Sequence, residues 1–167
     1  MTSIDDRVHR RSHEWRDPAI TAAAARDLDG VTFLRLLAAG ELPPAPIATT
    51  LGMTLLEVEP GRVVFGLDPA DHHYNPIGSV HGGVYATLLD SAAGCAVHSM
   101  LPAGVAYTSL DLSVKFLRPL RSGSGTVRCE GTVLHLGART ALAQARLTDG
   151  EGRLCAHATS SCVILRP

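Results

Sequence analysis

Residues 82–101 read GGVYATLLDSAAGCAVHSML and decide the fold that we expect for this chain. Apolar side chains recur around more than one face of a helix in this stretch, which predicts a helix largely wrapped by other elements. Its many alanine and glycine residues allow neighbouring strands to approach closely. Pro102 and Gly104 follow and are expected to end the helix.

Segments with strand character flank this helix on both sides. We expect strands over residues 51–59, 62–68, 106–117, 125–136, 139–148 and 153–165. The clearest alternation sets Thr108, Leu110, Leu112, Val114 and Phe116 against polar neighbours. Turns are predicted at Pro60-Gly61, at Gly137-Ala138 and over residues 149–152. One buried helix, preceded by two strands and followed by four, indicates an α+β fold in which an antiparallel sheet curls around a helix.

The first 45 residues have a helical sequence pattern, whereas most of the remaining chain has a strand pattern. They read as helical, with an alanine run at 22–25 and an apolar cluster over 33–37, and Gly40 is the expected stop. Three prolines between positions 43 and 46 then form a stiff connector. We therefore divide the chain into a helical N-terminal extension, residues 1–45, and a main domain, residues 46–167. The extension is expected to pack on that domain or on a partner subunit.

Composition and charge exclude several classes of protein. The 167 residues suit one domain, and 46% hydrophobic with 19% charged residues excludes intrinsic disorder. Fifteen basic and 16 acidic residues give a net charge of −1, which argues against nucleic-acid binding. No apolar run approaches the roughly 20 residues of a membrane helix. The charged N-terminus lacks the apolar segment of a signal peptide, so we expect a cytoplasmic protein.

Neither cysteines nor histidines are spaced as metal ligands. The four cysteines, at 95, 129, 155 and 162, match no zinc or redox motif, and we expect reduced thiols in or near the core. The eight histidines are dispersed without a metal-binding spacing. No Walker A loop and no G-x-S-x-G motif occurs. We therefore expect neither a metal nor a resident cofactor.

The polar loop before the long helix carries the strongest chemical signal. Residues 72–83 read HHYNPIGSVHGG, so two glycines stand where the helix begins. The first N–H groups of a helix have no internal acceptor, and this end carries partial positive charge. Without side chains, Gly82 and Gly83 let a ligand oxygen approach these amides, as an oxyanion site requires. The alternative is that both glycines only permit a tight turn and close packing.

Asp90 is the unusual residue within the helix. A carboxylate among apolar neighbours is costly unless it is paired or functional, and a desolvated carboxylate can act as a base or nucleophile. The alternative is a structural aspartate on a polar edge. Gly83 and Asp90 share a face but lie roughly 10 Å apart along the axis, too far to touch one carbonyl together. A two-fold dimer with antiparallel helices would bring each Asp90 towards the partner's glycines.

Three further polar residues have two interpretations each. Asn75 is either a donor to a substrate carbonyl or a turn residue before Pro76. Thr108 and Ser109 begin the alternating strand, and either hydroxyl can hold a water or a substrate group. The alternative for both is an ordinary polar residue on the face of a strand.

The combined pattern resembles the hotdog-fold acyl-CoA thioesterases, most closely the phenylacetate-pathway (PaaI-type) branch. The resemblance rests on Asn75-x-x-Gly78-x-x-His81-Gly82-Gly83 followed by Asp90, continues through residues 108–112 and 116–119, and spans about 48–165. It implies a hotdog domain, with a five- to six-stranded antiparallel sheet wrapped around one helix. It also implies a homodimer with the active site at the interface, and a homotetramer as a dimer of dimers.

The resemblance also implies roles for individual residues. Asp90 corresponds to the carboxylate that attacks the thioester or activates water, and Gly83 or Gly82 to the amide that polarises the carbonyl. His81 and Asn75 correspond to residues that support the carbonyl and the loop, and Ser109 to a hydroxyl that places the water. The substrate is an acyl-CoA, whose phosphates require basic residues at the rim of the site. The residues that we assign to substrate binding are Arg118, Arg121, Arg139 and Thr108; the alternative for each arginine is a solvated surface position.

Two other functions remain open. The first is a hydratase or dehydratase on the same fold, although no Asp precedes Asn75-Pro76 closely and the helix offers Asp90 but no Glu. The second is a non-catalytic acyl-CoA-binding module. The alanine-rich helix favours space for an aromatic or medium-length acyl group.

Overall fold

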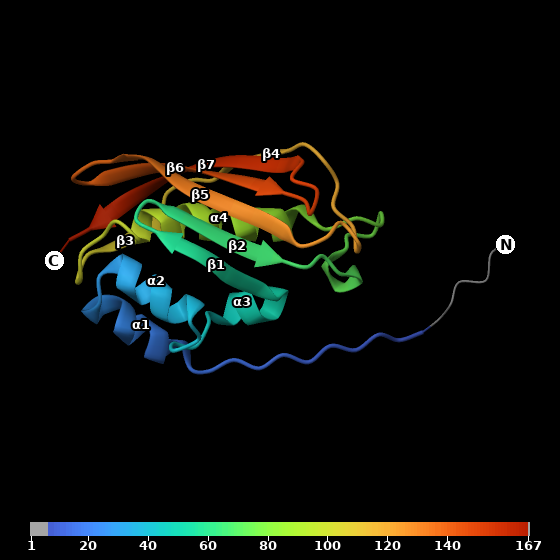
Figure 1. The fold of residues 1–167 in the computed structure, drawn as a ribbon, viewed down its shortest axis with the longest axis horizontal. Coiled ribbons are helices and arrows are strands. Elements are labelled where there is room, and N and C mark those ends of the chain that lie inside the picture. The colour runs from blue at the N-terminus through green and yellow to red at the C-terminus, as the bar shows by residue number, and fades with distance from the viewer. Residues whose placement is uncertain (1–6, 167) are drawn as a thin grey trace.

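The long helix and the curled sheet are both present. The structure is a computed structural model that describes residues 7–166, so residues 1–6 of the expected extension lie outside the described part. Helix α4 (Gly82–His98) lies against the concave side of an antiparallel sheet (Figure 1). Ala92, Ala93 and Val97 on this helix are fully buried. The expected α+β hotdog architecture is therefore confirmed.

The sheet has seven strands in the described chain. Their bounds are β1 (Met53–Glu59), β2 (Arg62–Leu67), β3 (Ala106–Ser109), β4 (Ser113–Phe116), β5 (Val127–Leu136), β6 (Thr140–Thr148) and β7 (Leu154–Leu165). The spatial order is β1-β2-β5-β6-β7-β3, and β4 also pairs with β7. All pairs are antiparallel. The β1–β2 turn uses Gly61 in the left-handed region, with φ of 79°.

The strand expected over residues 106–117 is divided into β3 and β4. Ser109 pairs with Cys162 and Ser113 with Thr159, so this side of the ladder holds one residue more than β7 does. The side chain of Asp111 holds the break, because its carboxylate accepts the N–H of Ser161 at 3.1 Å. One extra residue reverses which side chains face inward. The prediction of one uninterrupted strand over residues 106–117 was therefore wrong, and the sheet has seven strands where six were expected.

The N-terminal extension folds as short helices rather than one helix ending at Gly40. Helices α1 (Pro18–Asp27) and α2 (Gly30–Ala38) are each capped by an aspartate, and α3 (Pro46–Leu51), which starts the main domain, begins at the third proline. A further 3-10 turn, η1 (Asp71–His73), precedes the glycine-rich loop. Helix α2 lies beside β1 (Figure 1) and also packs on α4. Its residues Phe33 and Leu34 are buried. The extension therefore covers the face of α4 that the sheet leaves open.

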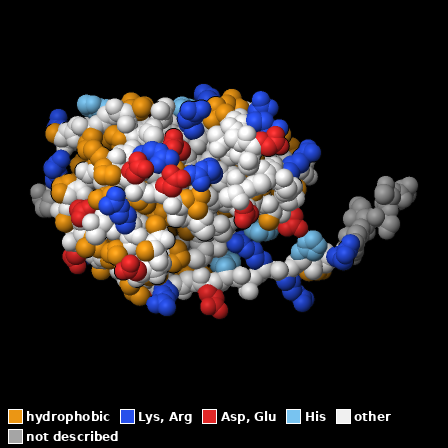
Figure 2. Space-filling view, in the orientation of Figure 1, with side chains coloured by type: hydrophobic (Ala, Val, Ile, Leu, Met, Phe, Trp, Pro, Cys, Tyr) orange, Lys and Arg blue, Asp and Glu red, His pale blue; other side chains and the backbone are white. Residues whose placement is uncertain are grey.

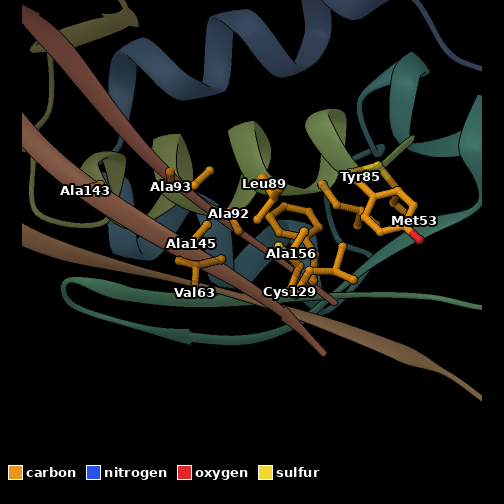
Figure 3. Packing of buried hydrophobic residues seen from close by; sticks show 14 of the residues in the cluster. Met53, Val63, Tyr85, Leu89, Ala92, Ala93, Cys129, Ala143, Ala145 and Ala156 are labelled. Atoms are coloured by element: carbon orange, nitrogen blue, oxygen red, sulfur yellow. The ribbon is translucent and has the colours of Figure 1, made fainter. Parts of the chain in front are cut away.

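Small residues set the separation between α4 and the sheet. Figure 3 shows the buried cluster, in which Ala92 and Ala93 of the helix face the strands. A Cβ built on Gly131 of β5 would lie 2.0 Å from the carbonyl oxygen of Ala92, so only glycine fits there. The expectation that small residues permit close strand approach is confirmed. Cys129, Cys155 and Cys162 are buried free thiols, as expected, and Cys95 is partly buried.

Charged side chains gather on the outer side of the sheet (Figure 2). Arg62 donates to Glu57 at 2.8 Å and to Glu130 at 2.7 Å, and Arg128 also pairs with Glu57. These pairs keep the pKa of Glu57 below its ordinary value, with the hydrogen bond from Arg62 as the main cause. Within residues 7–166, no helix combines the length and the apolar character needed to cross a membrane.

Candidate active site

The N-terminus of α4 presents one open amide. His81 is the N-cap residue, and its Nδ1 accepts the N–H of Gly83 at 2.9 Å. The N–H of Gly82 has no acceptor within the described residues, as expected for the first residue of a helix. The Phe116 ring lies beside it, 3.2 Å from where a Cβ on Gly82 would stand. Of the two glycines, Gly82 therefore has the amide that a ligand oxygen can reach in this chain.

Asn75 shapes the loop that leads into the helix. Its Oδ1 accepts the N–H groups of Ile77 at 3.0 Å and Ser79 at 3.2 Å, and its Nδ2 donates to the Ser79 hydroxyl. Gly78 completes the turn with φ of 85°. The His81 N–H donates to the carbonyl of His73, which ties the loop to η1. In the single chain the turn interpretation of Asn75 is thus the one observed.

Asp90 and Ser109 meet halfway along α4. The Ser109 hydroxyl, from the end of β3, donates to Asp90 Oδ1 at 3.0 Å. Asp90 is exposed in the single chain, so the interpretation as a desolvated carboxylate is wrong for one isolated chain. Thr108 precedes Ser109 on β3 and is exposed, and successive strand residues face opposite sides. Thr108 therefore points away from Asp90, and the structure does not bring it to this site.

Three hollows adjoin α4. One, of about 310 Å³, lies at its N-terminus between Gly82, Phe116 and Arg118. A second, shallow hollow of about 400 Å³ lies between Asp90 and residues 109–112. A third, of about 280 Å³, is lined mainly by apolar side chains and also reaches Asp90 and Ser109. The carboxylate–hydroxyl pair therefore stands where a shallow surface hollow meets an apolar cavity.

The three arginines do not form one rim. Arg118 lines the hollow at the α4 N-terminus, and its N–H donates to the carbonyl of Cys155. Arg121 follows in the next loop and is exposed. Arg139 lies beside Ile164, nine residues further along β7, which is roughly 30 Å of strand. Within one chain Arg139 is therefore separated from the other two.

Apart from Asp90, the ionisable side chains around the apolar cavity stay uncharged at neutral pH. Burial raises the pKa of the Cys95 thiol to about 12, so this cysteine stays protonated at neutral pH. Burial also raises the pKa of Tyr107 well above its ordinary value. No group of three or more potential metal ligands occurs among the described side chains. Among the residues that line the cavity, Asp90 is thus the one whose side chain could act as a base or nucleophile.

Sequence reasoning did not assign the residues that close this cavity. They come from the N-terminal extension, α3 and β3, namely Leu34, Leu37, Pro44, Ile47, Ala48 and Tyr107. The extension carried the pattern of an ordinary apolar helix. The extra residue after β3 concealed that the face shared by Tyr107 and Ser109 turns toward α4. No local motif marks these positions, because their role depends on tertiary packing.

Comparisons with known proteins agree with this fold. Residues 77–156 match the sequence pattern of the thioesterase superfamily. Human acyl-coenzyme A thioesterase 13 is 30% identical over 106 residues, covering 63% of this chain and 74% of that protein. A Halobacterium salinarum protein whose name assigns it provisionally to the esterases is 42% identical over 69 residues, covering 40% of this chain and 44% of that protein.

The solved structures give the same answer. A phenylacetic acid degradation-related protein of Ralstonia eutropha is 28% identical, with a TM-score of 0.70 over 78% of this chain and 98% of that one. The matched family region, residues 77–156, includes the end of the motif loop, all of α4 and most of the strands that follow it. The chain therefore belongs to the thioesterase superfamily, as a hotdog-fold thioesterase of the PaaI type.

Proposed function

We propose that this chain hydrolyses acyl-CoA thioesters of aryl or medium-chain acids to the free acid and CoA, with Asp90 as general base or nucleophile. That it is a thioester hydrolase follows from its superfamily. The observation that carries the finer proposal is the Asp90–Ser109 pair, 3.0 Å apart, where the shallow hollow meets the apolar cavity. The acyl group occupies the cavity and the CoA arm leaves by the hollow.

Asp90 supplies the step that water cannot perform alone. As a base it removes a proton from water while the water oxygen attacks the thioester carbonyl carbon. The C–S bond of the tetrahedral intermediate then breaks, its electron pair leaves on sulfur, and the proton held by Asp90 converts the thiolate to the thiol. As a nucleophile, Asp90 instead attacks the carbonyl carbon, and the C–S bond breaks with CoA leaving as the thiolate. Water then hydrolyses the resulting anhydride, which releases the free acid, restores the Asp90 carboxylate and supplies the proton that converts the thiolate to the thiol. Ser109 orients the carboxylate in either route.

We assign the oxyanion donor to the Gly82 amide. It is the first N–H of α4, it is free of an internal acceptor among the described residues, and the helix dipole favours negative charge there. His81 holds the neighbouring Gly83 amide, and Asn75 holds the loop, so both act as positioning residues. Arg118 and Arg121 lie near this end and suit the phosphates of CoA.

The spacing along α4 supports a site shared between two chains. Gly82 and Asp90 are eight residues apart, or roughly 12 Å along the axis, too far for one carbonyl to contact both. A two-fold dimer with neighbouring antiparallel helices places Gly82 of one protomer near Asp90 of its partner. We therefore propose a homodimer as the catalytic unit, assembled further into a homotetramer. The partner also provides the desolvation that exposed Asp90 lacks in one chain.

Thiol release from a panel of acyl-CoAs tests the function. We expect turnover of eight-carbon and aryl acyl-CoAs above that of acetyl-CoA. Binding of acyl-CoA without thiol release would favour the acyl-CoA-binding module instead. Loss of enoyl-CoA absorbance without thiol release would favour a hydratase, and either result would overturn the proposal.

One substitution isolates the Gly82 amide. Proline is well tolerated at the first position of a helix, and His81 already has the extended backbone that precedes proline, with φ of −63° and ψ of 139°. Gly82→Pro therefore deletes the N–H with the helix kept, whereas Gly82→Ala adds a similar Cβ beside Phe116 and keeps the N–H. We expect about 10²- to 10³-fold lower kcat for Gly82→Pro than for Gly82→Ala. Equal activities would exclude this amide as the oxyanion donor.

Mixed dimers test the shared site. A Gly82→Pro chain and an Asp90→Asn chain each lack one half of the site. In a hybrid dimer, one site receives both defects and the other receives neither. Random mixing makes half the dimers hybrid, so activity should recover to about a quarter of wild type if exchange is complete. No recovery, with hybrid formation verified by tagged chains, would place both residues in one protomer's site.

A further inference from the structure

We infer that the N-terminal extension closes the acyl pocket and that Leu37 of α2 sets how long an acyl chain the enzyme accepts. This inference rests on the proposed function and adds to it a determinant of specificity outside the matched family region, residues 77–156.

The apolar cavity beside Asp90 has two kinds of wall. One wall is α4, through Ser91, Gly94 and Cys95, with Tyr107 on β3. The opposite wall is formed by α2 of the extension together with α3, and Figure 3 shows α2 near α4. Gly94 lets the Tyr107 side chain pack against α4, because a Cβ there would lie 3.0 Å from the Tyr107 hydroxyl oxygen. The cavity therefore exists because α2 and α3 cover a helix face that the sheet leaves open.

The extension is firmly attached at this place. The Gly30 N–H donates to the carbonyl of Leu101 at 2.9 Å, and the α2 residue Phe33 packs against His98 with tilted rings whose centres are 5.2 Å apart. Leu34, which lines the cavity, is 1% exposed. A wall anchored in this way can limit the size of a ligand, because moving it breaks buried contacts.

Leu37 stands between two spaces. A larger hollow of about 640 Å³, bordered by Trp15 and Leu42, adjoins the apolar cavity and, unlike that cavity, does not reach Asp90. Leu37, Pro44 and Leu55 line both. They therefore form the partition that ends the cavity at the side away from Asp90. Leu37 lies on helix α2 and is half-buried, so its side chain can be shortened to alanine without disturbing the helix backbone.

The cavity size gives the length limit. At roughly 30 Å³ for each water-sized group, a volume of about 280 Å³ holds about nine non-hydrogen atoms. That is an acyl group of about eight carbons, aliphatic or aromatic. Each added methylene that finds an apolar site improves binding by about fourfold. Longer chains gain nothing in the wild type because the partition stops them.

The experiment compares chain-length profiles of kcat/KM for butyryl-, octanoyl- and dodecanoyl-CoA. Leu37→Ala joins the two spaces and should raise the ratio of dodecanoyl- to octanoyl-CoA by at least about tenfold. Leu37→Phe fills the cavity and should lower the ratio of octanoyl- to butyryl-CoA. Leu36→Ala is the matched control, because Leu36 is the adjacent residue on α2 and lines neither space.

The outcomes separate this inference from the proposed function. If the wild type releases thiol from none of these substrates, the proposed function fails. If the wild type is active but both Leu37 variants, folded by circular dichroism, keep its profile, the role of Leu37 is overturned and the hydrolase assignment stands. A profile that changes equally in Leu36→Ala would also overturn it. Opposite shifts in Leu37→Ala and Leu37→Phe are the expected result.

Discussion

Gly131→Ala is a stringent test of how α4 and the sheet are held together. The added Cβ would lie 2.0 Å from the carbonyl oxygen of Ala92, where an ordinary contact needs at least 3.4 Å. The obstacle is backbone, so it cannot rotate away, and α4 must retreat by roughly 1 Å or more. A gap of that size forfeits a quarter to a half of each dispersion contact across it. Ala92 is two residues from Asp90, so the retreat also moves the carboxylate relative to Ser109.

The expected cost lies at the upper end of measured overpacking, about 3 kcal/mol. For a chain of this length that corresponds to a fall in Tm of about 6–12 °C. The control is Gly66→Ala on the adjacent strand β2, where the new Cβ meets the partly exposed Leu56 side chain, which can rotate. We expect less than about 1 kcal/mol there. Urea and thermal unfolding measure both, and equal stability of the two variants would refute the close approach of β5 to α4.

Three further predictions concern single groups. Ser109→Ala should lower kcat by about tenfold through loss of the hydrogen bond to Asp90, and Ser109→Thr should keep most of the wild-type kcat. Thr108→Ala should leave kcat unchanged because Thr108 faces away from Asp90. Steady-state kinetics measure these effects, and an equal loss of kcat at both positions would contradict the prediction. Burial lowers the pKa of His98 below 6.5, so the unfolded chain binds the proton more readily and the free energy of unfolding should fall as pH drops below 6.5; urea melts of His98→Phe should show a weaker fall than wild type, and parallel curves would contradict the cause. Burial raises the pKa of Cys95 to about 12 and the pKa values of the other three thiols as well, so a disulfide reagent at pH 8 should label four thiols after unfolding and none rapidly before; one rapidly labelled thiol in the native protein would contradict it.

Local signals were enough to predict most of the architecture. The turn at residues 149–152 is one example, because Asp149 accepts the N–H groups of Glu151 and Arg153 as short turn motifs do. The wrapped helix is another, since its small and apolar residues repeat on several sides. These features depend on neighbours in the sequence, and they appear where the pattern placed them.

The interrupted edge strand depended on distant partners. The extra residue between β3 and β4 is held where Asp111 accepts the Ser161 N–H, 50 residues away. An alternating pattern continues through such a bulge unchanged, although the faces exchange. The sequence therefore indicated a hydroxyl on this strand, and only the fold distinguishes Ser109, which meets Asp90, from Thr108, which does not.

The site was likewise only partly predictable. The motif identified the α4 N-terminus and Asp90, but both glycines fitted the donor role equally well. The side chain of His81 separates them, because it takes the Gly83 amide. Arg118 and Arg139 looked alike as strand-end cations, and pairing with opposite ends of β7 sets them far apart. The cavity wall built by Leu34 and Leu37 arises from packing between elements about 50 residues apart.

The most direct measurement for the whole account is thiol release by Asp90→Asn beside wild type, on the best acyl-CoA of the panel. Asparagine keeps the size of the side chain and can still accept from Ser109, but it is neither a base nor a competent nucleophile. We predict a fall in kcat of about 10²-fold or more with an unchanged Tm. A variant that folds normally and stays within twofold of the wild-type rate would contradict the central role of Asp90.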